Sequence, residues 1–199
     1  MQKIRIDLAQ IPQFFKGLEE VCNLFCQNQL NIDRAFNVIQ EEWRDKNAKV
    51  TGEQLAETAR DIAKVYLSIG EAIDYIVEVC NNRAEYADFG RIAPPRINQF
   101  TTSLMEITNM DDSVIITDPD ALEEFKKELD KYSQSIVDNV DYLRNLYTKI
   151  GNSWDDVQYE NFGDALSTFT SRMQTQIDVL DKISAFLKAK IDILRRKNI

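Results

Sequence analysis

Apolar residues recur every three, four or seven positions along the first 80 residues of the chain. The first series consists of Phe14, Leu18, Val21, Phe25, Ile32, Phe36, Ile39 and Trp43. This spacing places one apolar stripe along an α-helix. Such a helix has roughly 30 to 35 residues and is about 50 Å long. A second stripe runs from Leu55 to Cys80, so the pattern predicts two long amphipathic helices in this part of the chain.

The same pattern returns 111 positions later without a gap, with stripes from Phe125 to Trp154 and from Leu166 to Ile191. The identities in this register are Ile4/Ile115, Asp7/Asp118, Phe14/Phe125, Lys16/Lys127, Leu18/Leu129, Asn28/Asn139, Trp43/Trp154, Asp45/Asp156, Gly52/Gly163 and Leu55/Leu166. Two unrelated amphipathic helices always align somewhere, but here both tryptophans fall in one register with the helix-cap residues. The sequence therefore predicts an internal duplication in which each copy is a helical hairpin.

Start and turn signals agree with this division. Asp118 followed by Pro119 is a helix start, because a side-chain acceptor precedes a residue without an N–H, and Asp7 is its counterpart in the first copy. Turn-forming residues flank each tryptophan. Ile4–Ile6 and Val114–Ile116 favour strands but are too short to predict a sheet. Between the copies, a double proline is followed by a segment, Ile97–Met110, that could form a short helix.

A long helix with one apolar stripe must bury it against another helix. We therefore predict an all-α fold in which two tandem helical hairpins pack as a four-helix bundle with a partly helical linker. The expected units are residues 1–84, the linker 85–114 and residues 115–199. Asn28 and Asn139 interrupt both stripes at equivalent positions. Each is either a polar residue at a helix edge or part of a buried pair that sets helix register.

Composition narrows the function. The chain has no histidine, three cysteines and a net charge of −9. The lack of histidine removes the commonest general base and metal ligand, and the acidity argues against nucleic acid as a partner. We expect no catalytic residue, cofactor, metal site or membrane span. The cysteines, Cys22 and Cys26 among them, are expected to fill helix interfaces in a reducing compartment. We expect a cytoplasmic protein, exported if at all without a cleaved signal peptide.

These features resemble the WXG family of small helical-hairpin proteins associated with type VII secretion. The resemblance rests on a tryptophan in each turn, on the openings Ile4-Arg5-Ile6-Asp7 and Val114 to Pro119, and on Phe162 eight positions after Trp154. The first copy has Thr51 in place of that aromatic residue. Aspartate stands two positions after each tryptophan, at Asp45 and Asp156, where the family usually has glycine.

The resemblance implies a non-enzymatic protein that is a secretion substrate or covers the helical leader of a larger toxin. The expected partner is a helical protein: a toxin leader, a WXG-type partner or a secretion ATPase. The alternative is a cytoplasmic immunity or adaptor protein that neutralises a toxin. Trp43, Asp45, Trp154, Asp156 and Phe162 are expected to pack the hairpin turns or to contact a partner. A monomer and a homodimer both remain open, as does pairing of the hairpins within or between chains.

Overall fold

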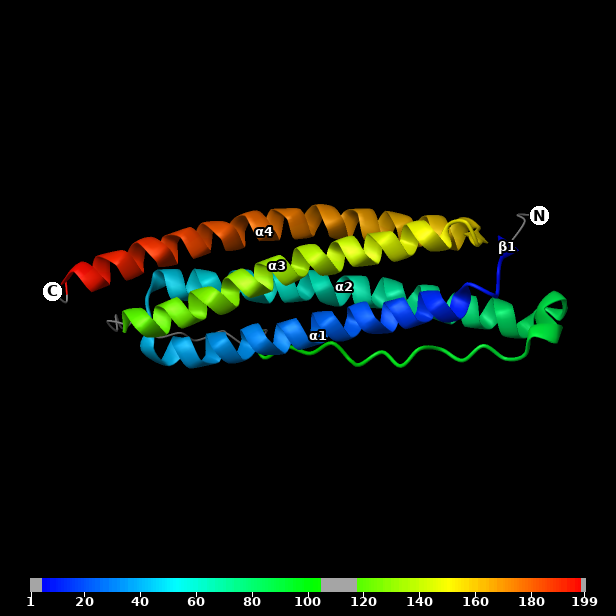
Figure 1. Ribbon diagram of the computed structural model, residues 1–199, viewed down its shortest axis with the longest axis horizontal. Helices are drawn as coiled ribbons and strands as arrows, with labels where there is room; N and C mark the ends of the chain where they lie inside the picture. The colour runs from blue at the N-terminus through cyan, green and yellow to red at the C-terminus, as the bar shows by residue number, and fades with distance from the viewer. Residues whose placement is uncertain (1–4, 105–117, 198–199) are drawn as a thin grey trace.

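Four long helices lie side by side and form a rod (Figure 1). The computed structural model describes residues 5–104 and 118–197. The helices are α1 (Ile11–Glu42), α2 (Lys46–Asn82), α3 (Pro119–Ile150) and α4 (Val157–Lys197). A short 3₁₀ helix, η1 (Ala84–Phe89), follows α2, and two strands, β1 (Arg5–Ile6) and β2 (Trp154–Asp155), have two residues each. The predicted all-α bundle of two hairpins is confirmed.

Every neighbouring pair of helices in the bundle is antiparallel. Within the hairpins, α1 turns back into α2 and α3 turns back into α4. Between the hairpins, α1 packs on α3 and α2 packs on α4. The ring of Phe36, late in α1, meets that of Phe125, early in α3, with centroids 5.9 Å apart. The two hairpin turns therefore lie at opposite ends of the rod (Figure 1).

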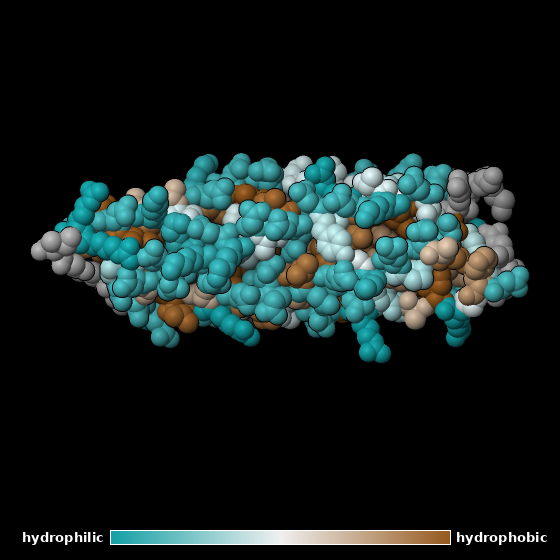
Figure 2. All heavy atoms as spheres, in the orientation of Figure 1, coloured by the Kyte–Doolittle hydropathy of each residue, from teal (hydrophilic) through white to brown (hydrophobic). Residues whose placement is uncertain are grey.

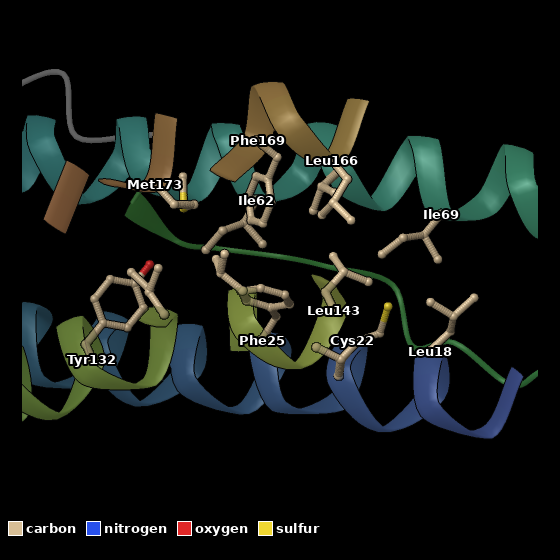
Figure 3. Close-up of a cluster of buried hydrophobic side chains, with 14 of the residues drawn as sticks. Leu18, Cys22, Phe25, Ile62, Ile69, Tyr132, Leu143, Leu166, Phe169 and Met173 are labelled. Carbon is tan, nitrogen blue, oxygen red and sulfur yellow. The ribbon is translucent and has the colours of Figure 1, made fainter. Parts of the chain in front are cut away.

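The apolar stripes of all four helices meet along the centre of the rod. Figure 3 shows side chains from the four helices converging on one another, among them Leu18, Ile62, Leu143 and Met173. All four are buried. On the face in Figure 2 hydrophilic residues predominate, and apolar residues appear in small separate patches. The core thus follows from the stripe that the sequence places on each helix.

The N-terminal strand joins the two hairpins. β1 pairs with β2 in antiparallel register, with Arg5 opposite Asp155 and Ile6 opposite Trp154. The N–H of Asp7 extends the pairing by donating to the carbonyl of Ser153 at 2.6 Å. The strand-favouring segment at Ile4–Ile6 is too short to predict a sheet from the sequence. Its last two residues form this ladder because Trp154 and Asp155, in the second turn, offer an extended edge. The other strand-favouring segment, Val114–Ile116, lies outside the described residues.

Residues 90–104, which we call the strap, run in extended form beside α1 (Figure 1). The amide side chain of Asn81 in α2 both donates to the carbonyl and accepts from the N–H of Ile92, at 3.0 and 2.9 Å. On α1, Asn23 accepts from Asn98 at 2.9 Å. The strap therefore lies along the groove between α1 and α2. These two helices pack on each other less extensively than α3 and α4 do.

The expected helix Ile97–Met110 is wrong over residues 97–102, which are extended, and residues 105–110 lie outside the described residues. The physical reason is that polar groups of the strap bond to the two neighbouring helices. Apolar contact adds to this, because the ring of Phe100 packs on that of Tyr66 with centroids 5.2 Å apart. Two prolines at positions 94 and 95 also favour extended backbone just before this segment.

Candidate functional site: the two tryptophan turns

The first turn joins α1 to α2 in three residues. Trp43 ends α1 and its side chain is fully buried. Asp45 is the N-cap of α2, and its Oδ1 accepts hydrogen bonds from the backbone N–H groups of Asn47 and Ala48 at 2.8 and 2.9 Å. The carboxylate thus satisfies two donors that an α-helix leaves unpaired at its start.

The second turn repeats this arrangement. Trp154 is fully buried, and Oδ1 of Asp156 accepts from the N–H groups of Gln158 and Tyr159 at 2.9 and 3.1 Å. The same oxygen also accepts from the indole Nε1 of Trp154 at 3.0 Å. In the first turn the Trp43 indole N–H lies close enough to the Asp45 carboxylate to help lower its pKa, but it makes no hydrogen bond of good geometry among the described residues. The aspartate two positions after each tryptophan is therefore a helix cap, a role that glycine could not fill with a side chain.

Each tryptophan packs against the first helix of the other hairpin. The ring of Phe125 in α3 lies on Trp43, with centroids 6.1 Å apart and planes at 54°. The ring of Phe14 in α1 lies on Trp154, with centroids 6.5 Å apart and planes at 58°. Phe14 and Phe125 are equivalent in the 111-residue register, as are the tryptophans. The hairpins are therefore related by an approximate two-fold axis. Each hairpin packs a phenylalanine ring on the tryptophan of the other.

The second helix of the opposite hairpin covers each turn as well. The Lys190 ammonium in α4 lies 2.5 Å from Oδ2 of Asp45 and 5.3 Å from the centre of the Trp43 ring. At the other end, the Tyr75 hydroxyl in α2 donates to Oδ2 of Asp156 at 2.8 Å, and its ring stacks on Trp154 at 6.3 Å. In both aspartates, Oδ1 thus accepts hydrogen bonds from N–H groups of its own hairpin, whereas Oδ2 accepts from a side chain of the opposite hairpin.

The contacts between the hairpins shift the pKa values of Asp45 and Tyr75 in opposite directions. Burial raises the pKa of the Asp45 carboxyl, but the hydrogen bonds from Lys190 and from the N–H of Ala48 outweigh it, so the pKa lies below its usual value. Burial, together with the hydrogen bond to the Asp156 carboxylate, raises the pKa of Tyr75 to about 12. At neutral pH Asp45 is therefore a carboxylate facing an ammonium, and Tyr75 is a neutral donor.

We predict that Lys190→Met lowers the free energy of unfolding by about 1 kcal/mol at neutral pH, because the Asp45 carboxylate loses its charged partner while the side-chain stem keeps its packing. A lowered folded-state pKa stabilises the fold above the unfolded pKa and stops doing so as pH falls through the folded pKa. The difference between Lys190→Met and wild type should therefore be constant near neutrality and shrink below about pH 4.

Urea unfolding across this pH range measures the effect. Lys188→Met, which removes the same charge from an exposed position on α4, is the control and should change stability little. An equal loss in the two variants at every pH would contradict the pairing of Lys190 with Asp45.

The second turn carries more aromatic side chains than the first. Phe162 is buried and stacks on Trp154 at 6.4 Å, and Tyr147 and Tyr159 stack on each other at 4.4 Å. In the first copy Thr51, at the position of Phe162, is buried and its hydroxyl donates to the carbonyl of Asn47 at 2.8 Å. The two turns are thus alike in the aspartate cap but differ in length, since residues 43–45 form the first and residues 151–156 the second, and in the side chains around the indole.

The structure does not bring Asn28 and Asn139 together as a hydrogen-bonded pair. Asn28 is half-buried, whereas Asn139 is buried and its Nδ2 has no partner among the described residues. Tyr132 donates to Gln29 at 2.7 Å and Tyr142 donates to Glu20 at 2.6 Å, so Asn139 faces the part of α1 nearer to Glu20. The asparagines lie on either side of the two-fold axis rather than on it. A role in register stays a prediction.

A charge pair between a buried carboxylate and a half-exposed arginine lies at the middle of the bundle instead. Asp61 in α2 is 2% exposed, and its carboxylate accepts from Arg172 in α4 at 3.0 Å and from Gln176 at 3.1 Å. Lys64 also lies 2.8 Å from this carboxylate. Asp61 and Arg172 are themselves 111 positions apart. Because equivalent positions meet only at a two-fold axis, this pair marks where the axis crosses the α2–α4 interface.

A second buried carboxylate, Asp33 in α1, anchors the strap. It is 4% exposed and accepts from Gln29 at 2.6 Å, from Thr102 at 3.0 Å and from the N–H of Ser103 at 2.8 Å. These donors satisfy the buried carboxylate of Asp33, which in turn holds the end of the strap against α1. Among the described residues no group of three or more His, Cys, Asp or Glu side chains is placed to hold a metal ion.

Sequence reasoning identified the tryptophans and aspartates of the turns but missed the residues that reach them from the opposite hairpin. Lys190, Tyr75, Asp61 and Arg172 were not singled out. For Asp61 and Arg172 a signal existed, since they carry opposite charges at equivalent positions of the repeat. Lys190 and Tyr75 are not equivalent to each other in that register, so their roles depend on how the helices pack.

Fold and turns together define the class: an all-α protein in which two helical hairpins with tryptophan turns pair about an approximate two-fold axis. Residues 114–192 match the family model described as WXG100, proteins of 100 residues with WXG. This segment includes α3, the second turn and most of α4, so the second hairpin is similar to the WXG family, which is associated with type VII secretion. No curated protein and no solved structure matches the chain.

WXG proteins act through contacts with other proteins. Across residues 5–104 and 118–197, none of the helices combines the length and the apolar character that crossing a bilayer requires. The comparison thus links the protein to a secretion-associated helical family without specifying a partner.

Proposed function

We propose that the chain is a tandem WXG protein, with hairpin units at residues 1–84 and 115–199 and a linker between them, and that it works as a non-enzymatic interaction protein of type VII secretion. In this role it is a secretion substrate or a helical partner that covers the leader of a larger toxin. The two hairpins pair with each other, so the chain is a complete pair that offers its outer surface to a partner.

The reciprocal packing of Phe14 on Trp154 and of Phe125 on Trp43 carries this proposal. A single hairpin leaves its apolar stripe uncovered and must find a second hairpin. Here the linker joins the two hairpins in one chain, so each hairpin encounters the other at a high effective concentration. Both indoles are fully buried by this pairing, which leaves the exposed helix surfaces for other proteins.

Affinity purification of the tagged chain from its native host, together with mass spectrometry of the culture supernatant, tests the proposal. We expect the chain in the supernatant, or bound in the cell to a larger protein whose N-terminal region is helical. Failure to recover either would contradict a role in secretion.

The acidic charge of −9 favours a second candidate, an immunity or adaptor protein that caps a basic partner in the cytoplasm. A stoichiometric complex with a toxin that stays in the cell, with none of the chain exported, would support this alternative over export. Recovery of the chain in the supernatant alone would contradict it.

A further inference from the structure

Two grooves on the α1–α3 face occupy equivalent positions at opposite ends of the rod. One lies between the start of α1 and the end of α3 and has a volume of about 550 Å³. The other lies between the end of α1 and the start of α3 and has a volume of about 660 Å³. Phe14 and Leu146 line the first, and the equivalent residues Phe125 and Ala35 line the second. The approximate two-fold axis therefore relates the grooves.

Their charges differ. The first groove is lined by Lys16, Lys149 and Glu20. The second is lined by Glu42, Glu124 and Glu128, with Arg34 as its cationic side chain, and we call it the acidic groove. Glu124 and Glu128 also form exposed ion pairs with Lys127 and Lys131 of α3, both at 2.6 Å, which contribute little energy in water and can exchange for another cation. At its side lies Val38, which is 70% exposed. The acidic groove thus combines an apolar surface with an excess of carboxylates, which suits a helix with apolar and basic residues on one face.

The same end of the molecule carries such a helix. The end of α4 runs on past the start of α3 and past the first turn (Figure 1). Ile193 there is 53% exposed, and Arg196 and Lys197, three and four positions later, are exposed on the same side of the helix. Arg195 instead binds Asp120 and Glu123 of its own chain, at 2.7 and 2.5 Å. We call Ile193, Arg196 and Lys197 the α4 tip.

We propose that two copies of the chain pair through these ends, with the α4 tip of each copy seated in the acidic groove of the other. One molecule carries both complementary surfaces at one end, so a two-fold dimer makes the contact twice and closes on itself. Ile193 packs on the apolar side of the groove near Val38, while Arg196 and Lys197 face its glutamates. The contact leaves the tryptophan turns and the pairing of the hairpins unchanged.

Sedimentation velocity over a range of protein concentrations tests the dimer. We expect a monomer–dimer equilibrium that weakens as ionic strength rises, because charge pairs at a partly exposed contact are screened by salt. Val38→Asp should raise the dissociation constant by about tenfold or more. Leu67→Asp is the matched control, since Leu67 is 69% exposed on α2 and should leave dimerisation unchanged.

A charge exchange locates the contact. One variant, Glu124→Lys with Glu128→Lys, makes the groove basic, and the other, Arg196→Glu with Lys197→Glu, makes the tip acidic. Each should be monomeric alone, because its groove and tip then carry the same sign. Mixed in equal amounts they should form a heterodimer, because both groove–tip contacts again join opposite charges.

A monomer at every concentration would overturn the proposal. So would a dimer that Val38→Asp and Leu67→Asp affect equally, or a mixture of the two charge variants that stays monomeric. Circular dichroism of each variant shows whether the bundle remains folded. Capture of a secretion partner does not enter these outcomes, so the dimer and the proposed secretion role fail or hold separately.

Discussion

Replacing Trp154 with alanine is expected to lower the free energy of unfolding by about 3–5 kcal/mol, the usual range for a large aromatic side chain removed from a core. Trp154 is fully buried and its ring meets those of Phe14, Tyr75, Tyr159 and Phe162. Two of these rings belong to the first hairpin, so the substitution weakens both the second turn and the contact between hairpins. Urea unfolding followed by far-UV circular dichroism measures the loss.

The phenylalanine variants of the two tryptophans separate packing from hydrogen bonding. Trp154→Phe removes the indole N–H that donates to Asp156 at 3.0 Å, whereas Trp43→Phe removes an N–H that lies near Asp45 without a well-formed hydrogen bond. Trp154→Phe should therefore cost about 1 kcal/mol more than Trp43→Phe. A larger loss for Trp43→Phe would show that the bond to Asp156 contributes little.

Replacing Asp33 with alanine is expected to lower the free energy of unfolding by about 2–3 kcal/mol, because donors on the buried Gln29, the half-buried Thr102 and the exposed Ser103 lose their common charged acceptor. The strap should also detach at this end. Trypsin would then cut the bond after Arg96, in the strap, faster than in wild type. Unfolding in urea and the rate of cleavage together report the change.

Asp33→Asn is the matched control. It retains one acceptor oxygen in the same place, so it should show a smaller loss of stability and slower cleavage than Asp33→Ala. If Asp33→Ala resists trypsin as well as wild type does, the carboxylate does not hold the strap.

The helices of the bundle could be predicted from the sequence because their information is local and repeated. One apolar stripe per helix specifies which face is buried, and the common register of Trp43 and Trp154 specifies where each hairpin turns. The cap at Asp118 could be predicted for the same reason, because its side chain accepts from the N–H of Asp120 two residues later. The expectation for Asp7 is wrong, because α1 begins at Ile11 after Gln10 and has no side-chain cap.

The strap and the cross-hairpin contacts could not be predicted in this way. Ile97–Met110 was interpreted as a helix from local pattern, yet Asn81 and Asp33, distant in sequence, bind groups of the extended strap and favour that conformation. The approach of Lys190 to Asp45 likewise joins residues 145 positions apart. Contacts of this kind depend on which helices become neighbours and in what register, and no single segment of sequence contains that information.

The pair of Asp61 and Arg172 has a consequence for how the halves choose partners. If the first hairpin paired with a copy of itself in the same geometry, Asp61 would face Asp61, and in the second hairpin Arg172 would face Arg172. Two like charges at this interface repel, most strongly for the buried Asp61 carboxylate, whereas the mixed pair attracts. Separated halves should therefore prefer each other to themselves. The opposite charges at this axial position therefore select the pairing of unlike hairpins over the pairing of like ones.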